Sequence, residues 1–208
     1  MVNRSCIEWN YPKPDENYYN AIYERIPLGL QSILAYGLIK GLILDVGNSN
    51  SNSAGFRPYG VPEDKGPYSW FERDSSKKQP RPCWEYYVHL SEYIRLYESF
   101  KSKSIELKFE DNLMDIGMYK NGNLWICCEI KEKSSQARKL IKDIKQFEDA
   151  NDLPDDDRGK DPLRKAKYIS RYKPDYFYLV SMGRRYEFRV EYPQGMNFEL
   201  VEDMVPLI

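Results

Sequence analysis

Residues 114–131 contain two runs in which apolar residues alternate with other residues, joined by a short turn signal at residues 121–122. Alternate residues of a β-strand share one face, so each run predicts a strand with one apolar face. Asn-Gly between two such runs is a strong hairpin signal. The segment therefore predicts a β-hairpin. Its apolar side chains are Met114, Ile116 and Met118 on the first strand, and Leu124, Ile126, Cys128 and Ile130 on the second.

The other faces of the two strands carry Asp115 on the first strand, and Glu129 and Lys131 on the second. A two-residue turn at 121–122 would place the two carboxylates on opposite faces, because a shift of one residue reverses the face. A three-residue loop over 120–122, ending in a left-handed glycine, places both apolar sets on one face and the charged residues on the other. We therefore expect the three-residue loop, with the charged face outside the core.

Two carboxylates and a lysine at the end of a sheet suit a hard divalent cation, because Mg²⁺ prefers oxygen ligands. Such an ion polarises a phosphate and lowers the pKa of a bound water. A neighbouring ammonium can orient or help deprotonate that water and offset the charge that develops on phosphorus. The pattern therefore predicts hydrolysis of a phosphodiester. The alternative is a solvated hairpin face with a cross-strand Glu–Lys pair.

The composition limits the other chemistries. The chain has 208 residues and a net charge of −1, so it can bury a full core, and any basic surface must be local. Its four cysteines, Cys6, Cys83, Cys127 and Cys128, have no CxxC spacing, and the single His89 cannot complete a Cys/His zinc site or suggest a serine triad. We expect reduced thiols and a cytoplasmic protein.

No membrane segment is expected. The apolar run over residues 28–44 contains Gln31, Ser32, Lys40 and three glycines, so it predicts a buried helix rather than a membrane span. No signal peptide is recognised before the predicted fold.

Apolar periodicity predicts the order of elements along the chain. They are helices over 15–26 and 28–43, irregular structure over 56–82, a helix over 84–100, a strand over 104–109, the hairpin, an amphipathic helix capped by Ser134-Ser135, a short basic helix over 162–172, a buried strand over 176–182 and a closing hairpin of 186–192 and 197–203. A helix between a strand and a buried parallel strand makes a right-handed crossover, so we expect a mixed sheet covered on both faces.

This order, with Asp115 on the second strand and Glu129-Ile130-Lys131 on the third, resembles the PD-(D/E)xK nuclease superfamily over residues 84–183. Met114 stands where proline is frequent in that superfamily. The resemblance implies an α/β, restriction-endonuclease-like αβββαβ core with a mixed sheet flanked by helices. That core would span 84–208, and 1–83 would form a mainly helical and loop-rich elaboration packed on it.

The resemblance also implies roles for the motif residues. Asp115 and Glu129 would bind Mg²⁺, with Mn²⁺ as a substitute, and the Ile130 carbonyl would be a third ligand. Lys131 would be the catalytic lysine. Many members of the superfamily add a glutamate from the first helix, and we favour Glu85, which lies nearer the helix start than Glu92.

Basic and amide side chains near this motif and in segment 158–173 are candidates for contact with DNA phosphates. The alternative is a solvated helix face. The candidates are Lys133, Gln136, Arg164, Lys165, Lys167, Arg171, Arg184 and Arg185.

The sequence therefore predicts a Mg²⁺-dependent endonuclease that acts on DNA, such as a restriction, anti-phage or mobile-element nuclease. One alternative is a non-catalytic member of the fold that binds nucleic acid or a partner. The retention of both carboxylates and the lysine favours the enzyme. Another alternative is a junction resolvase, which the N-terminal extension and near-neutral charge fit poorly. The sequence leaves open a homodimer or a partner subunit.

Overall fold

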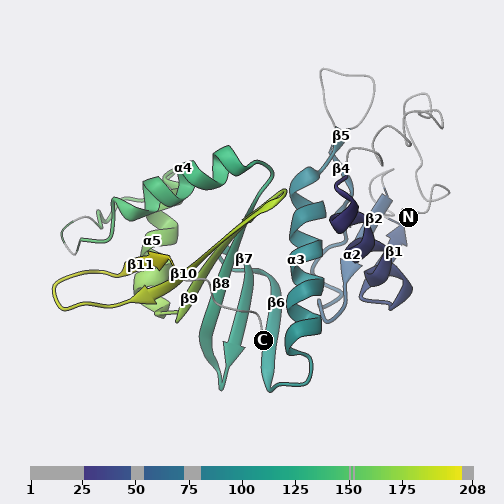
Figure 1. Cartoon of the computed structure of the whole chain (residues 1–208), viewed down its shortest axis with the longest axis horizontal. Coiled ribbons are helices and arrows are strands. Elements are labelled where there is room, and N and C mark those ends of the chain that lie inside the picture. The colour runs from purple at the N-terminus through teal and green to yellow at the C-terminus, as the bar shows by residue number, and fades with distance from the viewer. Residues whose placement is uncertain (1–25, 48–53, 73–80, 150, 152, 203–208) are drawn as a thin grey trace. The chain divides into compact units, whose positions relative to one another are not determined.

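The computed structural model describes residues 26–47, 54–72, 81–149, 151 and 153–202 (Figure 1). The described residues form an α/β protein with a six-stranded mixed sheet and four helices. Two compact units divide the chain after Arg95, within helix α3 (Trp84–Phe100). The sequence-based division after residue 83 assigned all of this helix to the second part. The helix predicted over 15–26 lies outside the described residues.

The first unit begins with a helix that is shorter than the predicted 28–43. Helix α2 (Leu28–Ile39) ends because Gly41 adopts a left-handed conformation with a φ of 69°. The Leu42 N–H then donates to the Gly37 carbonyl at 2.8 Å, which closes the helix end. The apolar residues that follow start strand β1 (Ile43–Gly47) instead of extending the helix.

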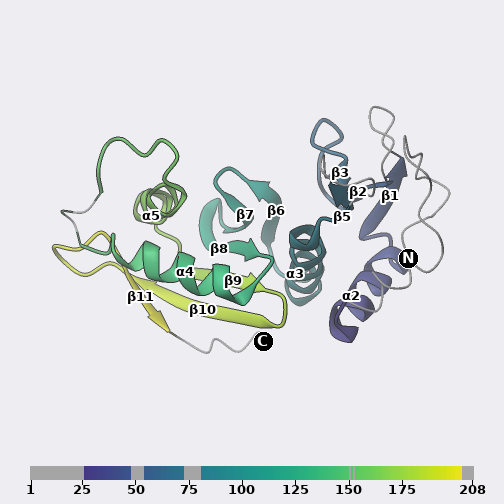
Figure 2. The ribbon, with the colours of Figure 1, turned by 90° about the horizontal axis from the view of Figure 1, so that it is seen from above.

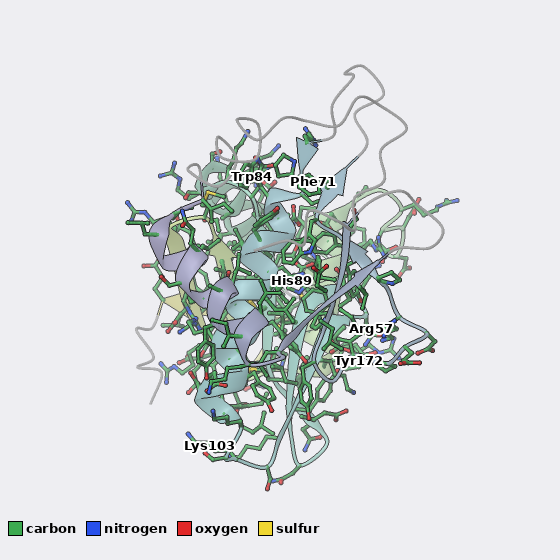
Figure 3. All side chains as sticks on the ribbon, turned by 90° about the vertical axis from the view of Figure 1, so that its right-hand side faces the viewer. Arg57, Phe71, Trp84, His89, Lys103 and Tyr172 are labelled. Atoms are coloured by element: carbon green, nitrogen blue, oxygen red, sulfur yellow. The ribbon has the colours of Figure 1, made fainter. Side chains whose placement is uncertain are left out.

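Segment 56–82 contains short strands, so the prediction of irregular structure there was wrong. Strand β2 (Ala54–Pro58) pairs with β1 and β3 (Tyr68–Ser69), and β4 (Phe71–Glu72) pairs with β5 (Arg81–Pro82). Aromatic packing holds them, since the ring centroids of Phe56 and Trp70 lie 4.3 Å apart and both side chains are buried. The Cys83 N–H donates to the Trp70 carbonyl at 2.9 Å just before α3 begins at Trp84, which is labelled in Figure 3.

The second unit contains the six-stranded sheet. Its strands are β6 (Ile105–Asp111), β7 (Met114–Lys120), β8 (Asn123–Lys131), β9 (Tyr176–Ser181), β10 (Arg184–Glu191) and β11 (Glu199–Glu202). They lie in the order β11-β10-β9-β8-β7-β6, and only the β8–β9 pair is parallel. The predicted hairpin, buried strand and closing hairpin are confirmed.

Helices α4 (Ser134–Lys145) and α5 (Asp161–Tyr172) lie between β8 and β9 in sequence and pack on one face of the sheet (Figure 2). Their buried side chains include Ala137, Leu140, Ile144, Ala166 and Ile169. On the helix-covered face of β8, Cys127 is 0% exposed and Glu129 is 2% exposed. The side chains on the opposite face of β8, Ile126, Cys128 and Ile130, are buried as well. The prediction of a sheet covered on both faces therefore holds at its centre only, because Arg189 and Glu191 of β10, on the face away from the helices, are 51% and 40% exposed. The prediction that the charged face lies outside the core was wrong.

The hairpin register also differs from the prediction. The turn has two residues, Asn121 and Gly122, both with positive φ, instead of the predicted three-residue loop. A bulge at Trp125 then adds one residue to β8, so the pairing shifts between Met118 and Tyr119. The bulge returns Asp115 and Glu129 to one face of the sheet, whereas a plain two-residue turn would have placed them on opposite faces. It also moves Leu124, from the predicted apolar set, into the core beneath the two helices.

Two further findings concern the whole described chain. In the part of the chain that the structure describes, Cys83, Cys127 and Cys128 are free thiols, as predicted. No helix among the described residues is long and apolar enough to cross a membrane.

Candidate active site

Glu129 on β8 lies between two lysines. Its Oε1 accepts a hydrogen bond from Lys131 Nζ at 2.6 Å, and its Oε2 accepts one from Lys165 Nζ of α5, also at 2.6 Å. Lys165 Nζ donates to the Leu113 carbonyl at 2.7 Å as well. The side chains of Glu129 and Lys165 are 2% and 6% exposed, whereas Lys131 is 20% exposed. The motif glutamate is therefore a buried carboxylate with one buried and one partly exposed counter-charge.

Burial has the largest effect on the acidity of Glu129. Burial and, next in size, the negative charge of Asp115 together raise the pKa of Glu129 from 4.5 to about 7. The ammonium groups of Lys165 and Lys131 act in the opposite direction. Asp115 accepts a hydrogen bond from the N–H of Ile130, the residue after Glu129, so the two predicted carboxylates lie in one site.

Asp115 lies at the start of β7, where its pairing with β8 ends. The last paired residues are Ile116 and Cys128. Beyond them, Asp115 Oδ2 accepts a hydrogen bond from the Ile130 N–H at 2.5 Å. The N–H and C=O of one strand residue point to the same side of the strand, so the Ile130 carbonyl also faces the side on which Asp115 lies. Its role as a metal ligand stays a prediction, and this placement is compatible with it.

Glu110 on β6 is a third carboxylate at this place, and it was not predicted from the sequence. The ladder pairs Asp111 with Met114, so the next position, Glu110, lies across from Asp115. A carboxylate oxygen of Glu110 and one of Asp115 lie within 4.8 Å of one another. Glu110 also has a positive φ of 53°, which is uncommon for a residue with a side chain. A two-residue turn at 112–113, inferred from the sequence, could have revealed this pairing.

The donor set fits a hard divalent cation. Glu110 and Asp115 present carboxylate oxygens within 4.8 Å of one another, and like charges at that separation favour a bridging cation. The Ile130 carbonyl would add a neutral oxygen, and Glu129 a further carboxylate. Oxygen ligands of this kind suit Mg²⁺ or Mn²⁺.

A buried polar cluster anchors α5 beside this site. Asp111 Oδ2 accepts hydrogen bonds from the hydroxyls of Tyr119 at 2.5 Å and Tyr168 at 3.4 Å. Gly117 makes room for it, because a Cβ there would lie 2.1 Å from Asp111 Oδ2. Tyr168 lies one helical turn after Lys165 in α5. The cluster therefore helps to hold Lys165 against Glu129.

The predicted first-helix glutamates belong to the first unit. Glu92 is buried and pairs with Arg95, with Nη2 of the arginine 2.8 Å from Oε1 of the glutamate. Burial raises the pKa of Glu92, and Arg95 opposes that change. The catalytic role given to Glu85, with Glu92 as the alternative, stays a prediction.

Three of the residues predicted to contact phosphates are buried or half-buried and paired with acidic side chains. Lys165 is buried against Glu129, so its prediction as a surface contact was wrong. Lys167 Nζ donates to the Asp155 carbonyl at 2.8 Å and lies 3.3 Å from Asp157 Oδ2. Arg185 forms an ion pair with Glu187 and lies over the ring of Tyr178, 4.5 Å from its centroid.

The other five predicted contacts, Lys133, Gln136, Arg164, Arg171 and Arg184, are exposed. The Lys133 N–H donates to Gln136 Oε1 at 2.9 Å, so this amide closes the start of α4. The helix begins at Ser134 with Lys133 as its N-cap, instead of the predicted Ser134-Ser135 cap.

Glu129 should make the stability of the fold depend on pH. Its pKa is about 7 in the folded protein and near 4.5 ordinarily, so between these values the folded state binds more protons than the unfolded state. This contribution to the free energy of unfolding is present below about pH 4.5 and is lost as the pH rises through about 7. Glu129→Gln should flatten the dependence, which urea unfolding at about pH 5 and about pH 8 would measure. An equal slope in parent and variant would contradict this.

Comparisons with family models, with curated proteins and with solved structures found no match to this chain.

Proposed function

We propose that this protein is a metal-dependent nuclease that hydrolyses phosphodiester bonds in DNA, with Asp115, Glu129 and Lys131 in its active site. The proposal places it in the PD-(D/E)xK superfamily and in the cytoplasm. A restriction, anti-phage or mobile-element role is compatible with this chemistry.

The strand topology supports the restriction-endonuclease-like core. Helix α3 precedes the antiparallel strands β6, β7 and β8, and helix α4 then leads toward β9, which pairs with β8 in parallel. This is the αβββαβ order, with α5 inserted between α4 and β9. The paired strands also carry the motif at the expected places, Asp115 on the second and Glu129 on the third.

The observation that carries the proposal is the convergence of charged groups at the adjoining ends of β6, β7 and β8. Lys131 Nζ lies 2.6 Å from Glu129, and Asp115 is near enough to raise the Glu129 pKa. Glu110 adds a carboxylate within 4.8 Å of Asp115. A solvated hairpin face would not need a buried glutamate with two lysines around it.

The chain's own residues divide the work of hydrolysis. Glu110, Asp115, Glu129 and the Ile130 carbonyl would hold Mg²⁺, which supplies Lewis acidity and a more acidic water when bound. Lys131, as the more exposed lysine, would orient the attacking water and offset the charge that develops on the phosphate. Lys165 is buried, so it would hold the Glu129 side chain in place instead of touching substrate.

Nicking of supercoiled plasmid tests the proposal. The parent protein should nick DNA with Mg²⁺ or Mn²⁺ and should be inactive in EDTA. Asp115→Asn, purified in the same way, is the matched control, because its amide oxygen can still accept from the Ile130 N–H while its charge is lost. Equal nicking by parent and variant would assign the activity to another site or to a contaminant.

A non-catalytic, DNA-binding member of the fold is the second candidate. The occupation of both Glu129 oxygens by ammonium groups favours it, since the same contacts would suit a purely structural charge cluster. Binding of DNA by the parent, without nicking in Mg²⁺ or Mn²⁺, would support this candidate over the enzyme.

A further inference from the structure

The exposed side of helix α4 carries a row of positive charge. Arg138, Lys139 and Lys142 are all exposed, and their spacing of three and four residues places them on one helical face. The opposite side of α4 is buried through Ala137, Leu140 and Ile144. We call Arg138, Lys139 and Lys142 the α4 basic face.

These three side chains make no polar contacts with the described part of the protein. Within the described ranges, none of the three forms an ion pair or a side-chain hydrogen bond. Lys145 on the same helix is different, because its Nζ donates to the Leu200 carbonyl at 2.9 Å. In the neighbourhood of α5, Lys165 and Lys167 are engaged with acidic residues. The α4 basic face is therefore a local positive surface on a chain whose net charge is −1.

Helix α4, which carries the α4 basic face, starts beside the candidate active site. Lys131 is the last residue of β8 and pairs with Ser181 of β9. The Ser181 hydroxyl oxygen lies 3.2 Å from that of Ser134, the first residue of α4. The helix therefore starts beside Lys131 and leads away from it. With a rise of about 1.5 Å per residue, Arg138 and Lys142 lie about 6 Å apart along the axis.

We propose that the α4 basic face binds the phosphate backbone of the DNA substrate and leads it to Lys131. This inference rests on the proposed function and names the surface that holds its substrate. A row of exposed cations complements the negative charge of a phosphodiester backbone, and contacts of this kind do not involve the bases. Binding through this face should therefore be independent of DNA sequence and sensitive to salt.

The test compares two triple variants for binding to a fluorescent DNA duplex in EDTA, where cleavage is excluded. The first is Arg138→Gln, Lys139→Gln, Lys142→Gln, which keeps good helix formers at these positions. The comparison variant removes the same charge from exposed positions that the sequence predicts as phosphate contacts, so it tests the rival surface. It is Arg164→Gln, Arg171→Gln, Arg184→Gln.

The α4 variant should bind at least about tenfold more weakly at about 0.1 M salt, and its salt slope should fall by up to about 2.7, near 0.9 per lost phosphate contact. The comparison variant should lose less affinity and less salt slope than the α4 variant. For the enzyme, saturating DNA at low salt should restore most of the α4 variant's rate, because the active site is unchanged.

Several results would overturn the proposal. One is an equal or larger loss of affinity in the comparison variant, and another is a parent protein that does not bind the duplex. A third is an α4 variant that binds DNA as well as the parent does but binds vesicles of anionic lipid more weakly. Loss of DNA binding in the α4 variant, with a parent that does not cleave DNA, would support this surface and reject the enzyme. The two failures can thus be told apart.

Discussion

Glu129→Gln should lower the rate of Mg²⁺-dependent DNA cleavage by at least about a thousandfold, which corresponds to about 4 kcal/mol of transition-state stabilisation. The amide keeps the shape of the side chain, but it is a weaker ligand for a hard cation and no longer carries charge. Single-turnover cleavage measures the rate, and Mn²⁺ binding followed by electron paramagnetic resonance measures metal affinity. Both should fall together.

The burial of Glu129 adds a consequence for stability. At about pH 8 the carboxylate is ionised, since its pKa is about 7. Its removal then leaves Lys165, only 6% exposed, without a counter-charge. The loss of one partner of a buried ion pair costs about 3–5 kcal/mol. We therefore expect Glu129→Ala to be destabilised by an amount in this range, whereas a charged face outside the core, as predicted from the sequence, would leave the fold intact.

A double variant separates the two effects. Glu129→Gln with Lys165→Met removes the buried charges together, so most of the stability should return while cleavage stays absent. Urea unfolding and cleavage assays on the two single variants and the double variant form a complete cycle. Normal cleavage by folded Glu129→Gln would remove this residue from the active site. Parent-like stability of Glu129→Ala would contradict the buried ion pair.

Lys131→Met should reduce kcat by about 10²–10⁴-fold, the usual range for a group that orients or deprotonates a nucleophile. Its side chain is 20% exposed, so the loss of its ion pair with Glu129 should cost only about 1 kcal/mol of stability. Affinity for Mg²⁺ should change much less than after Glu129→Gln, because Lys131 is not a metal ligand. Steady-state kinetics with a metal titration would measure these quantities.

Lys165→Met is the matched comparison, because both lysines contact Glu129 at 2.6 Å. Lys165 is the more buried, so its removal should cost more stability than that of Lys131. Parent-like cleavage by Lys131→Met, with loss of cleavage by a folded Lys165→Met, would transfer the catalytic role to the helix lysine. Loss of cleavage in both variants at unchanged stability would mean that both lysines act in the reaction.

The sequence by itself determined the elements of the second unit. Alternation over 114–131 specified the hairpin, the spacing of Ala137, Leu140 and Ile144 specified α4, and the apolar run over 176–182 specified β9. Each pattern reports which side of one element is apolar, and that is a property of consecutive residues. The motif carboxylates and Lys131 could be named for the same reason.

Local backbone geometry set the first limit on what the apolar patterns could predict. The positive φ of Gly41 ended α2 before the apolar pattern did, and the short strands of 54–72 formed without clear alternation. The extra residue at Trp125 restored a face that the two-residue turn would have reversed. A bulge changes the register of a strand pair without changing the composition of the strands. Apolar alternation therefore predicted that Asp115 and Glu129 share one face, but it did not predict the bulge that places them there.

Only the tertiary structure decided which charges meet. Lys165 lies 36 positions from Glu129 in sequence, yet its ammonium is buried against it, and Glu110 reaches the site through the pairing of β6 with β7. The same packing left Arg138, Lys139 and Lys142 in solvent. Sequence periodicity identifies a face that must be covered but not the element that covers it. The packing of α4 and α5 on the sheet therefore determined that Lys165 became the buried counter-charge of Glu129 and that the α4 basic face remained exposed.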